Sequence, residues 1–206
     1  MEQSDLLITL RIKGYAKPDA LVSALGLTKQ DVDLMLAHLT EEQLVELAKP
    51  GFRLTSEGQK AAHTAMAAER GQVTGAAVQH LYERFGAVNE RFKALVGAWQ
   101  MRPTDGKSVP NDHSDAGYDQ ALLAELGTID HEIALIVGEL AARIPRLARY
   151  TTRFEESLRR LRSGEPRYMA APLIDSYHTV WFELHEDLIC LAGKTRAEEA
   201  AHGRAV

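Results

Sequence analysis

The sequence has one cysteine and no long apolar run. Cys190 alone cannot form an intramolecular disulfide, so the fold must be held together by packing and polar contacts. No apolar stretch has the length of a membrane span or of a signal peptide. These absences predict a cytoplasmic protein that has no membrane partner.

Aromatic residues are also scarce. They make up 6% of the 206 residues, whereas hydrophobic residues make up 45% and charged residues 26%. This composition is typical of a folded helical protein that packs mainly with Leu and Ala. The length suits a small module of about 65 residues followed by a second domain with its own core. We therefore expect two domains, at residues 1–70 and 71–206.

Motifs of common catalytic and metal sites are missing as well. The sequence has no glycine-rich phosphate loop and no serine nucleophile elbow, and Cys190 lies between Ile189 and Leu191 as a buried, inert thiol would. Residues of metal-ligating type lack the spacing of a known zinc motif. They are Asp112, His113, Asp130, His131, His178, Glu183, His185 and Glu186. We predict no enzymatic activity, no metal site and no cofactor.

Residues 6–59 predict three helices followed by a β-hairpin. The first helix covers residues 4–13, the second begins at Pro18 and ends at Gly26, and Thr28 caps the third. The hairpin consists of Leu44–Leu47, a Lys49-Pro50-Gly51 turn and Phe52–Leu54. This order of parts is that of a winged helix-turn-helix, which places one helix in the DNA major groove.

The third helix has two distinct faces. Apolar residues at helical spacing are expected to face inward, namely Val32, Met35, Leu36 and Leu39. The outward face consists of Gln30, Asp33, Leu34, Ala37, His38 and Glu41. The outward face is therefore the surface that a partner would contact.

Two motifs in this segment resemble those of a known family. They are Ala24-Leu25-Gly26-Leu27 with Val32, Leu36 and Leu39, and Phe52-Arg53-Leu54-Thr55 with Gly58. Over residues 6–60 they resemble the winged helix-turn-helix of MarR-like bacterial regulators, which implies that the third helix binds DNA. A second resemblance, to winged modules attached to phosphotransfer enzymes that use phosphoenolpyruvate, implies docking to a partner protein instead.

A set of polar residues would contact DNA if the third helix enters the major groove. Thr28, Lys29 and Gln30 lie at its N-terminus, where they would contact phosphates or base edges. Asp33 lies on the same face and would repel phosphates. Phosphate contacts would come from Lys17, Lys49 and Arg53. The alternative is that these are ordinary solvated side chains on a domain that binds another protein.

The charge distribution argues against DNA binding by a single copy. Residues 1–70 contain eight Lys and Arg against ten Asp and Glu, a net charge of −2. Because so few cations bind the phosphate backbone weakly, we expect a homodimer. Helices at residues 74–100 and 172–192 are the candidates for its interface.

The rest of the chain reads as helices separated by one long loop. Helices are expected at Ser56–Arg70, Thr74–Gln100, Tyr118–Arg143, Pro145–Arg162 and Pro172–Ala192. Residues 101–117 are expected to be a flexible loop, Gly193 to end the last helix, and residues 194–206 to be frayed. The expected fold is mainly α, with an N-terminal winged helix and an all-helical C-terminal domain.

Arginines gather in residues 143–162, where seven Arg stand against two Glu. Five of them follow helical spacing along one side of a helix, at Arg143, Arg146, Arg149, Arg153 and Arg160. Such a row can bind an anionic ligand, flanking DNA or the acidic residues of a second subunit. The alternative is a solvated face that nearby carboxylates neutralise.

The last expected helix combines aromatic rings with imidazoles. His178, Trp181, Phe182 and His185 share one face, with Tyr177 beside them. With Arg146 and Arg149, this face can line a pocket for an anionic aromatic or acyl effector, or it can be plain core. We predict a dimeric DNA-binding regulator that senses a small molecule. The alternative is a docking module that regulates a partner enzyme without binding DNA.

Overall fold

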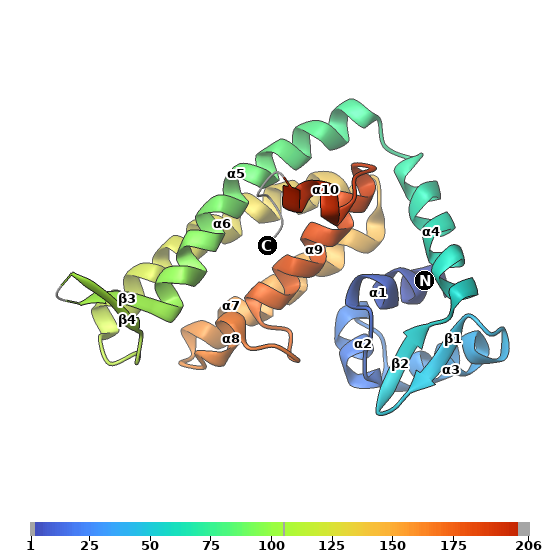
Figure 1. Ribbon diagram of the computed structural model, residues 1–206, viewed down its shortest axis with the longest axis horizontal. Coiled ribbons are helices and arrows are strands. Elements are labelled where there is room, and N and C mark those ends of the chain that lie inside the picture. The colour runs from blue at the N-terminus through green and yellow to red at the C-terminus, as the bar shows by residue number, and fades with distance from the viewer. Residues whose placement is uncertain (1–2, 105, 202–206) are drawn as a thin grey trace.

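The computed structural model describes residues 3–104 and 106–201, which form a mainly helical molecule with two short antiparallel hairpins (Figure 1). The first part of the chain contains α1 (Gln3–Lys13), α2 (Pro18–Leu25), α3 (Lys29–Glu41), β1 (Val45–Ala48), β2 (Gly51–Leu54) and α4 (Ser56–Arg70). The order predicted for these elements is confirmed, and their bounds agree with the prediction to within one residue.

Capping residues explain why these bounds were predictable. Gly26 ends α2 in the left-handed conformation, with φ at 66°. Thr28 begins α3, where its Oγ1 accepts a hydrogen bond from the Asp31 amide at 3.2 Å. Thr55 begins α4 in the same way by accepting from the Gly58 amide at 3.1 Å. The hairpin pairs Val45 with Leu54 at its base.

The second part of the chain begins with two long helices, α5 (Gly75–Gln100) and α6 (Ala116–Ala141), which pack against each other. Between them lie β3 (Met101–Thr104) and β4 (Lys107–Pro110), and after them come a 3₁₀ turn at Pro145–Ala148, α7 (Arg149–Arg162), α8 (Arg167–Ala170), α9 (Tyr177–Leu191) and α10 (Arg196–Ala201). Three arginine–glutamate pairs join α5 to α6, namely Arg91 with Glu125 and Glu132, and Arg84 with Glu139.

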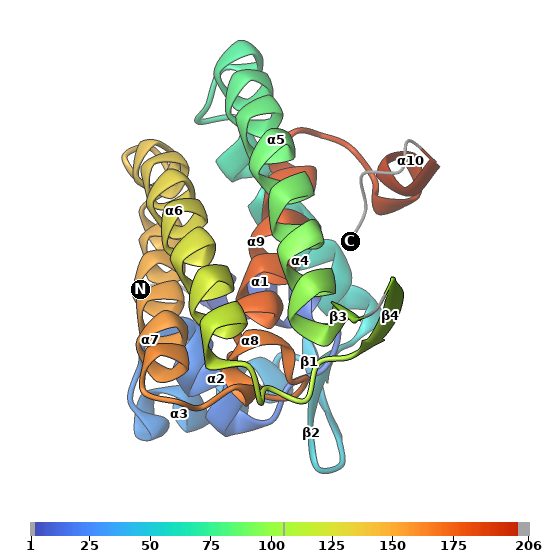
Figure 2. The same cartoon turned by 90° about the vertical axis from the view of Figure 1, so that its left-hand side faces the viewer.

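Helix α9 is the central element of the molecule. It packs against α1, α4, α5, α7 and α8, and none of its residues is classed as exposed. Figure 2 shows it enclosed between α5 on one side and α6 with α7 on the other. The prediction that this helix forms a dimer interface is therefore wrong, because its surface is already covered by the same chain.

The buried apolar side chains form two clusters. One draws on residues 6–62 and includes Leu6, Leu21, Leu36 and Val45. The other draws on residues 73–191 and is centred on the aromatic residues of α5, α7 and α9. Two cores are what two domains would have, but the boundary expected at residue 70 stays a prediction.

Among the described residues of the predicted loop at 101–117, only Gly106 and residues 111–115 lie in neither a helix nor a strand, and the second part of the chain is not all helical. The pairing of Met101 with Pro110 and of Thr104 with Lys107 makes β3 and β4 a hairpin. Gly106, with φ at 75°, provides the left-handed residue that its tight turn requires. The Asp105-Gly106 dipeptide was the sequence signal for this turn, although Asp105 itself lies outside the described residues.

Further bounds differ from the prediction, beginning with α6, which spans Ala116–Ala141 and not Tyr118–Arg143. A 3₁₀ turn precedes α7, so the predicted helix at Pro145–Arg162 is α-helical only from Arg149. Helix α9 begins at Tyr177 because Ser176 Oγ accepts a hydrogen bond from the Thr179 amide at 3.3 Å. The tail is not frayed throughout, since α10 occupies Arg196–Ala201, and residues 202–206 lie outside the described residues.

Within the described ranges, none of the helices combines the length and apolar character needed to cross a lipid bilayer.

Candidate functional site

The outward face of α3 is arranged as the sequence predicts. Val32, Leu36 and Leu39 are buried and Met35 is half-buried, whereas all six residues expected on the outer face are exposed. One of them is apolar: Leu34 is 63% exposed. The face also carries Asp33 and Glu41, so α3 presents a mixed apolar and acidic surface.

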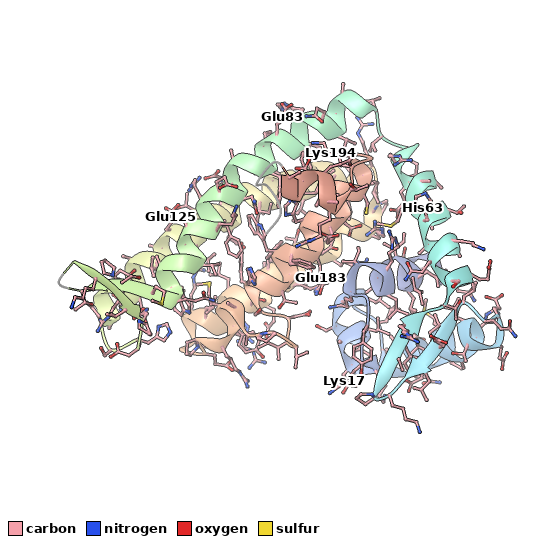
Figure 3. The ribbon with its side chains drawn as sticks, in the orientation of Figure 1. Lys17, His63, Glu83, Glu125, Glu183 and Lys194 are labelled. Carbon is pink, nitrogen blue, oxygen red and sulfur yellow. The ribbon has the colours of Figure 1, made fainter. Side chains whose placement is uncertain are left out.

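The residues predicted to contact DNA all lie on the surface of α3, the hairpin and the start of α2. Lys17, Thr28, Lys29, Gln30, Asp33, Lys49 and Arg53 are all classed as exposed. Lys17 immediately precedes α2 and is labelled in Figure 3 beside the lower end of the hairpin. The structure therefore brings the predicted set to one corner of the molecule.

Two of these cations are already paired with carboxylates. Lys29 Nζ lies 3.4 Å from Asp33 Oδ2, and Arg53 Nε donates to Glu46 Oε1 at 2.7 Å. Because both pairs are exposed, each is weak and each cation can exchange its carboxylate for another anion. Asp33 therefore acts on this surface as the partner of Lys29.

A first group of buried ion pairs joins α1 and α2 to α7 and α9. Arg153 donates to both oxygens of Asp175, at 2.8 and 2.9 Å, and its Nη1 lies 2.8 Å from Glu183 Oε2. Lys13 pairs with Glu183, and Ser23 Oγ donates to Asp175 at 2.7 Å. Glu183 lies on the side of α9 that faces α1 (Figure 3). Polar contacts thus hold the first part of the chain on the helical body.

A second group joins α4 to α9 through Arg146. This guanidinium donates to both oxygens of Glu69, at 2.6 and 2.7 Å, and to both oxygens of Asp187, at 2.8 and 2.6 Å. Burial alone would raise the pKa of Asp187, but Arg146 and the Tyr150 hydroxyl hold that pKa below its ordinary value. Asp187 therefore stays ionised although its side chain is fully buried.

These contacts correct the prediction for the arginine row. The guanidinium groups of Arg146 and Arg153 are not available to an anionic effector, because they already form ion pairs with carboxylates of the same chain. Arg160 pairs with Glu156 and Glu165, while Arg149 is half-buried and Arg143 is exposed. The row is thus divided between internal ion pairs and surface, and it does not form one open stripe.

The aromatic face of α9 is packed into the core. Tyr177 and Trp181 are both 0% exposed. The Trp181 indole donates to Asn89 Oδ1 at 2.8 Å and its ring stacks on Phe92, with centroids 4.2 Å apart, while the Tyr177 hydroxyl donates to Asp130 at 3.0 Å. Since these groups are satisfied within the protein, the structure favours the core interpretation for them over an open effector pocket.

The other residues of this face differ in their surroundings. His178 is half-buried, with its ring centroid 6.1 Å from that of Phe92. Phe182 is half-buried beneath the Arg196 guanidinium, which lies 4.3 Å from its ring centroid. His185 is 2% exposed, and its Nδ1 has no hydrogen-bond partner. Burial lowers the pKa of His185 to about 4, so its imidazole is neutral at physiological pH.

Three residues near His185 form a group that the sequence did not predict. They are Tyr82 on α5, Lys194 after α9 and Glu199 on α10, which contact one another. Helical spacing could not reveal this group, because Tyr82 and Glu199 are separated by 117 positions. No sequence signal indicated this group, because residues 194–206 were expected to be frayed.

Cys190 is half-buried, and burial raises the pKa of its thiol to about 11, which agrees with an inert side chain. Among the described residues, no three His, Cys, Asp or Glu side chains come together in a way that suits a metal ion. Comparison with protein-family models, with curated proteins and with solved structures found no match to this chain.

Proposed function

We propose that this chain is a DNA-binding regulator that acts as a homodimer through a winged helix-turn-helix in its first 60 residues. The observation that carries the proposal is the placement of α3 and the β1–β2 hairpin. Both reach the lower edge of the molecule in Figure 2, with the helical body above them. A left-handed Gly26 separates α2 from α3, as a sharp helix-turn-helix connection needs.

In this proposal α3 enters the major groove with its N-terminus leading. Gln30 is exposed in the first turn of α3, where its amide can hydrogen-bond to a base edge. Lys17 and Lys49 would contact phosphates, and Lys29 and Arg53 would exchange their carboxylate partners for phosphates. These contacts are few and partly offset by nearby acids, so a single copy would bind weakly.

Of the two helices expected at the dimer interface, α9 is buried and the exposed side of α5 carries Glu83, Glu90 and Arg91. The second copy would therefore dock on the outer face of α6. Six exposed residues of α6 and its C-cap residue Ala142 follow alternating spacings of three and four. None of the seven is Asp, Glu, Lys or Arg: Ala121, Ala124, Thr128, His131, Leu135, Gly138 and Ala142. We call them the α6 row. This spacing is that of helices that pair lengthwise. Leu135, which is 52% exposed, is its largest apolar member.

Fluorescence anisotropy with a labelled duplex from upstream of the gene tests DNA binding, with random duplex as competitor. We expect sequence-specific binding that weakens steeply with salt. The double variant Lys17→Glu with Lys49→Glu should bind at least tenfold more weakly, while Lys107→Glu on β4, equally exposed, should bind as the wild type does. Absence of any binding at low salt would reject the proposal.

A second candidate is docking to a partner protein, which a different observation favours. Leu34 on α3 and Leu47 on β1 are 63% and 56% exposed, and acidic residues accompany them at Asp33, Glu41 and Glu46. Exposed apolar side chains with acidic neighbours suit a basic protein surface better than phosphates. Docking predicts that no duplex binds even at low salt. It also predicts that a partner protein captured by the wild type is not captured by Leu34→Asp but is still captured by Lys17→Glu.

A further inference from the structure

Helix α10 covers a buried polar group at the end of α9. Lys194 lies three residues after the end of α9 and beside α10 in Figure 3. Glu199, on α10, is 1% exposed, which is unusual for a carboxylate on a short helix near the end of the chain. Taking a carboxylate out of water is costly unless strong partners receive it. The groups that contact Glu199 therefore indicate which kind of chemical group this position can bind.

Two groups on different elements receive the Glu199 carboxylate. The Tyr82 hydroxyl donates to Oε2 at 2.6 Å, and Lys194 Nζ lies 3.1 Å from Oε1. Lys194 also lies over the Tyr82 ring, 4.3 Å from its centroid. A phenol hydroxyl that donates, with an ammonium over the ring of the same phenol, can together bind one carboxylate group.

The imidazole of His185 lies beside these two groups. Its ring centroid is 6.3 Å from that of Tyr82 and 4.9 Å from that of Phe85. Its side chain is almost completely buried, yet Nδ1 has no hydrogen-bond partner. A buried polar atom without a partner is costly, so a ligand that satisfies it gains affinity.

Helix α10 has the properties of a segment that can leave. It has six residues, too few to be stable as an isolated helix. Gly193, with φ at 69°, precedes it and allows the backbone to turn there. Its contacts on α9 include those of Arg196, which pairs with Glu186 and covers the ring of Phe182.

We propose that Glu199 occupies a binding site for a small monocarboxylate with an apolar body, and that such a ligand replaces α10. The carboxylate of the ligand would accept from Tyr82 and pair with Lys194. Its body would lie against Phe85 and Phe182, and a ligand that also carries a hydrogen-bonding group on that body would satisfy Nδ1 of His185. The site does not depend on DNA binding, so the failure of one proposal leaves the other standing.

Isothermal titration calorimetry on the full chain tests this site, with 3-phenylpropanoate as the probe and 3-phenylpropanamide as its neutral counterpart. Glu199→Ala removes the internal carboxylate, and Glu83→Ala on α5 is the matched control at an exposed glutamate (Figure 3). We expect Glu199→Ala to bind the carboxylate at least tenfold more tightly than the wild type and the control. The amide should show no such gain.

Two variants keep the test decisive. Truncation after Thr195 removes α10 and should bind the carboxylate as Glu199→Ala does, which covers the case in which the point variant fails to fold. Adding Tyr82→Phe to Glu199→Ala should abolish the gain, because the donor to the carboxylate is lost. Equal gains for carboxylate and amide, or no gain with either Glu199→Ala or the truncation, would overturn the proposal.

Discussion

Arg146 and Asp187 form a two-point ion pair that is closed to solvent. Nη1 donates to Oδ2 at 2.8 Å, Nη2 donates to Oδ1 at 2.6 Å, and the Asp187 side chain is 0% exposed. Glu69 of α4 binds the same guanidinium from another side. Because a planar guanidinium donates hydrogen bonds only in fixed directions, this contact constrains how α4 packs on α9.

Breaking this pair should destabilise the protein strongly. Arg146→Met removes the cation and leaves Asp187 buried with only the Tyr150 hydroxyl as a partner. We expect the free energy of unfolding to fall by about 3–5 kcal/mol, because an unpaired buried charge is costly. Urea denaturation followed by circular dichroism measures this change.

The matched control is Arg159→Met, since Arg159 also forms a two-point pair, with Glu156, but on the surface. Water can solvate the exposed Glu156 carboxylate once Arg159 is removed. The urea midpoint of Arg159→Met should therefore stay close to that of the wild type. The double variant Arg146→Met with Asp187→Leu should recover much of the lost stability. If Arg146→Met and Arg159→Met have equal effects, the Arg146 pair does not hold α4 on α9.

His185 should make stability depend on pH between about 6.5 and 4. Burial, with Arg196 and Lys93 nearby and Glu199 opposing them, lowers its pKa to about 4 in the folded chain, whereas an unfolded histidine titrates near 6.5. The unfolded chain therefore binds the proton first as the pH falls. Stability is unaffected above pH 6.5 and declines toward pH 4, by about 3 kcal/mol at most.

Comparison with His185→Leu isolates this contribution, because the carboxylates that titrate below it are present in both proteins. The wild-type chain should lose stability relative to the variant between pH 7.5 and pH 4.5 in urea denaturation. A difference between the two proteins that stays constant over this range would show that His185 is accessible to protons in the folded state.

Gly58 should be intolerant of a side chain. A Cβ at this position would lie 1.9 Å from the Leu44 carbonyl oxygen, which is backbone and cannot rotate away. Gly58→Ala should therefore destabilise the chain by about 1–3 kcal/mol and displace the hairpin from the start of α4. Gly86→Ala, in the middle of α5 with nothing within 4 Å, should instead stabilise it by about 0.5–1 kcal/mol. Thermal unfolding of the two variants distinguishes these opposite signs.

The sequence predicted best those elements whose bounds depend on nearby residues. Gly26, Thr28 and Thr55 act on backbone groups within four positions, so α2, α3 and α4 could be placed almost to the residue. The β3–β4 hairpin depends on an equally local turn at Gly106. It was missed because the surrounding residues are too polar to show the alternation of a half-buried strand.

The candidate sites were harder to predict because their chemistry depends on distant partners. Spacing placed Arg146 in a helical row of arginines, whereas it lies in the 3₁₀ turn before α7. Its partners Glu69 and Asp187 are separated from it by 77 and 41 positions. Periodicity likewise placed Trp181 and His185 on one face of α9. It could not show that α5 and α7 cover that face and that α10 lies beyond it.

Leu135→Glu tests the α6 row as the contact between two copies. Leu135 is half exposed in the single chain, so the substitution should leave the fold and the unfolding temperature nearly unchanged. In a dimer paired along α6, two glutamates would face an apolar contact and drive the copies apart. Light scattering should show a dimer for the wild type and a monomer for Leu135→Glu. Leu173→Glu, at a 95% exposed leucine outside the row, should remain dimeric.

If both variants dimerise as the wild type does, the copies meet on another surface. If only Leu135→Glu is monomeric, its affinity for DNA should fall while Lys17, Lys49 and Arg53 are all still present.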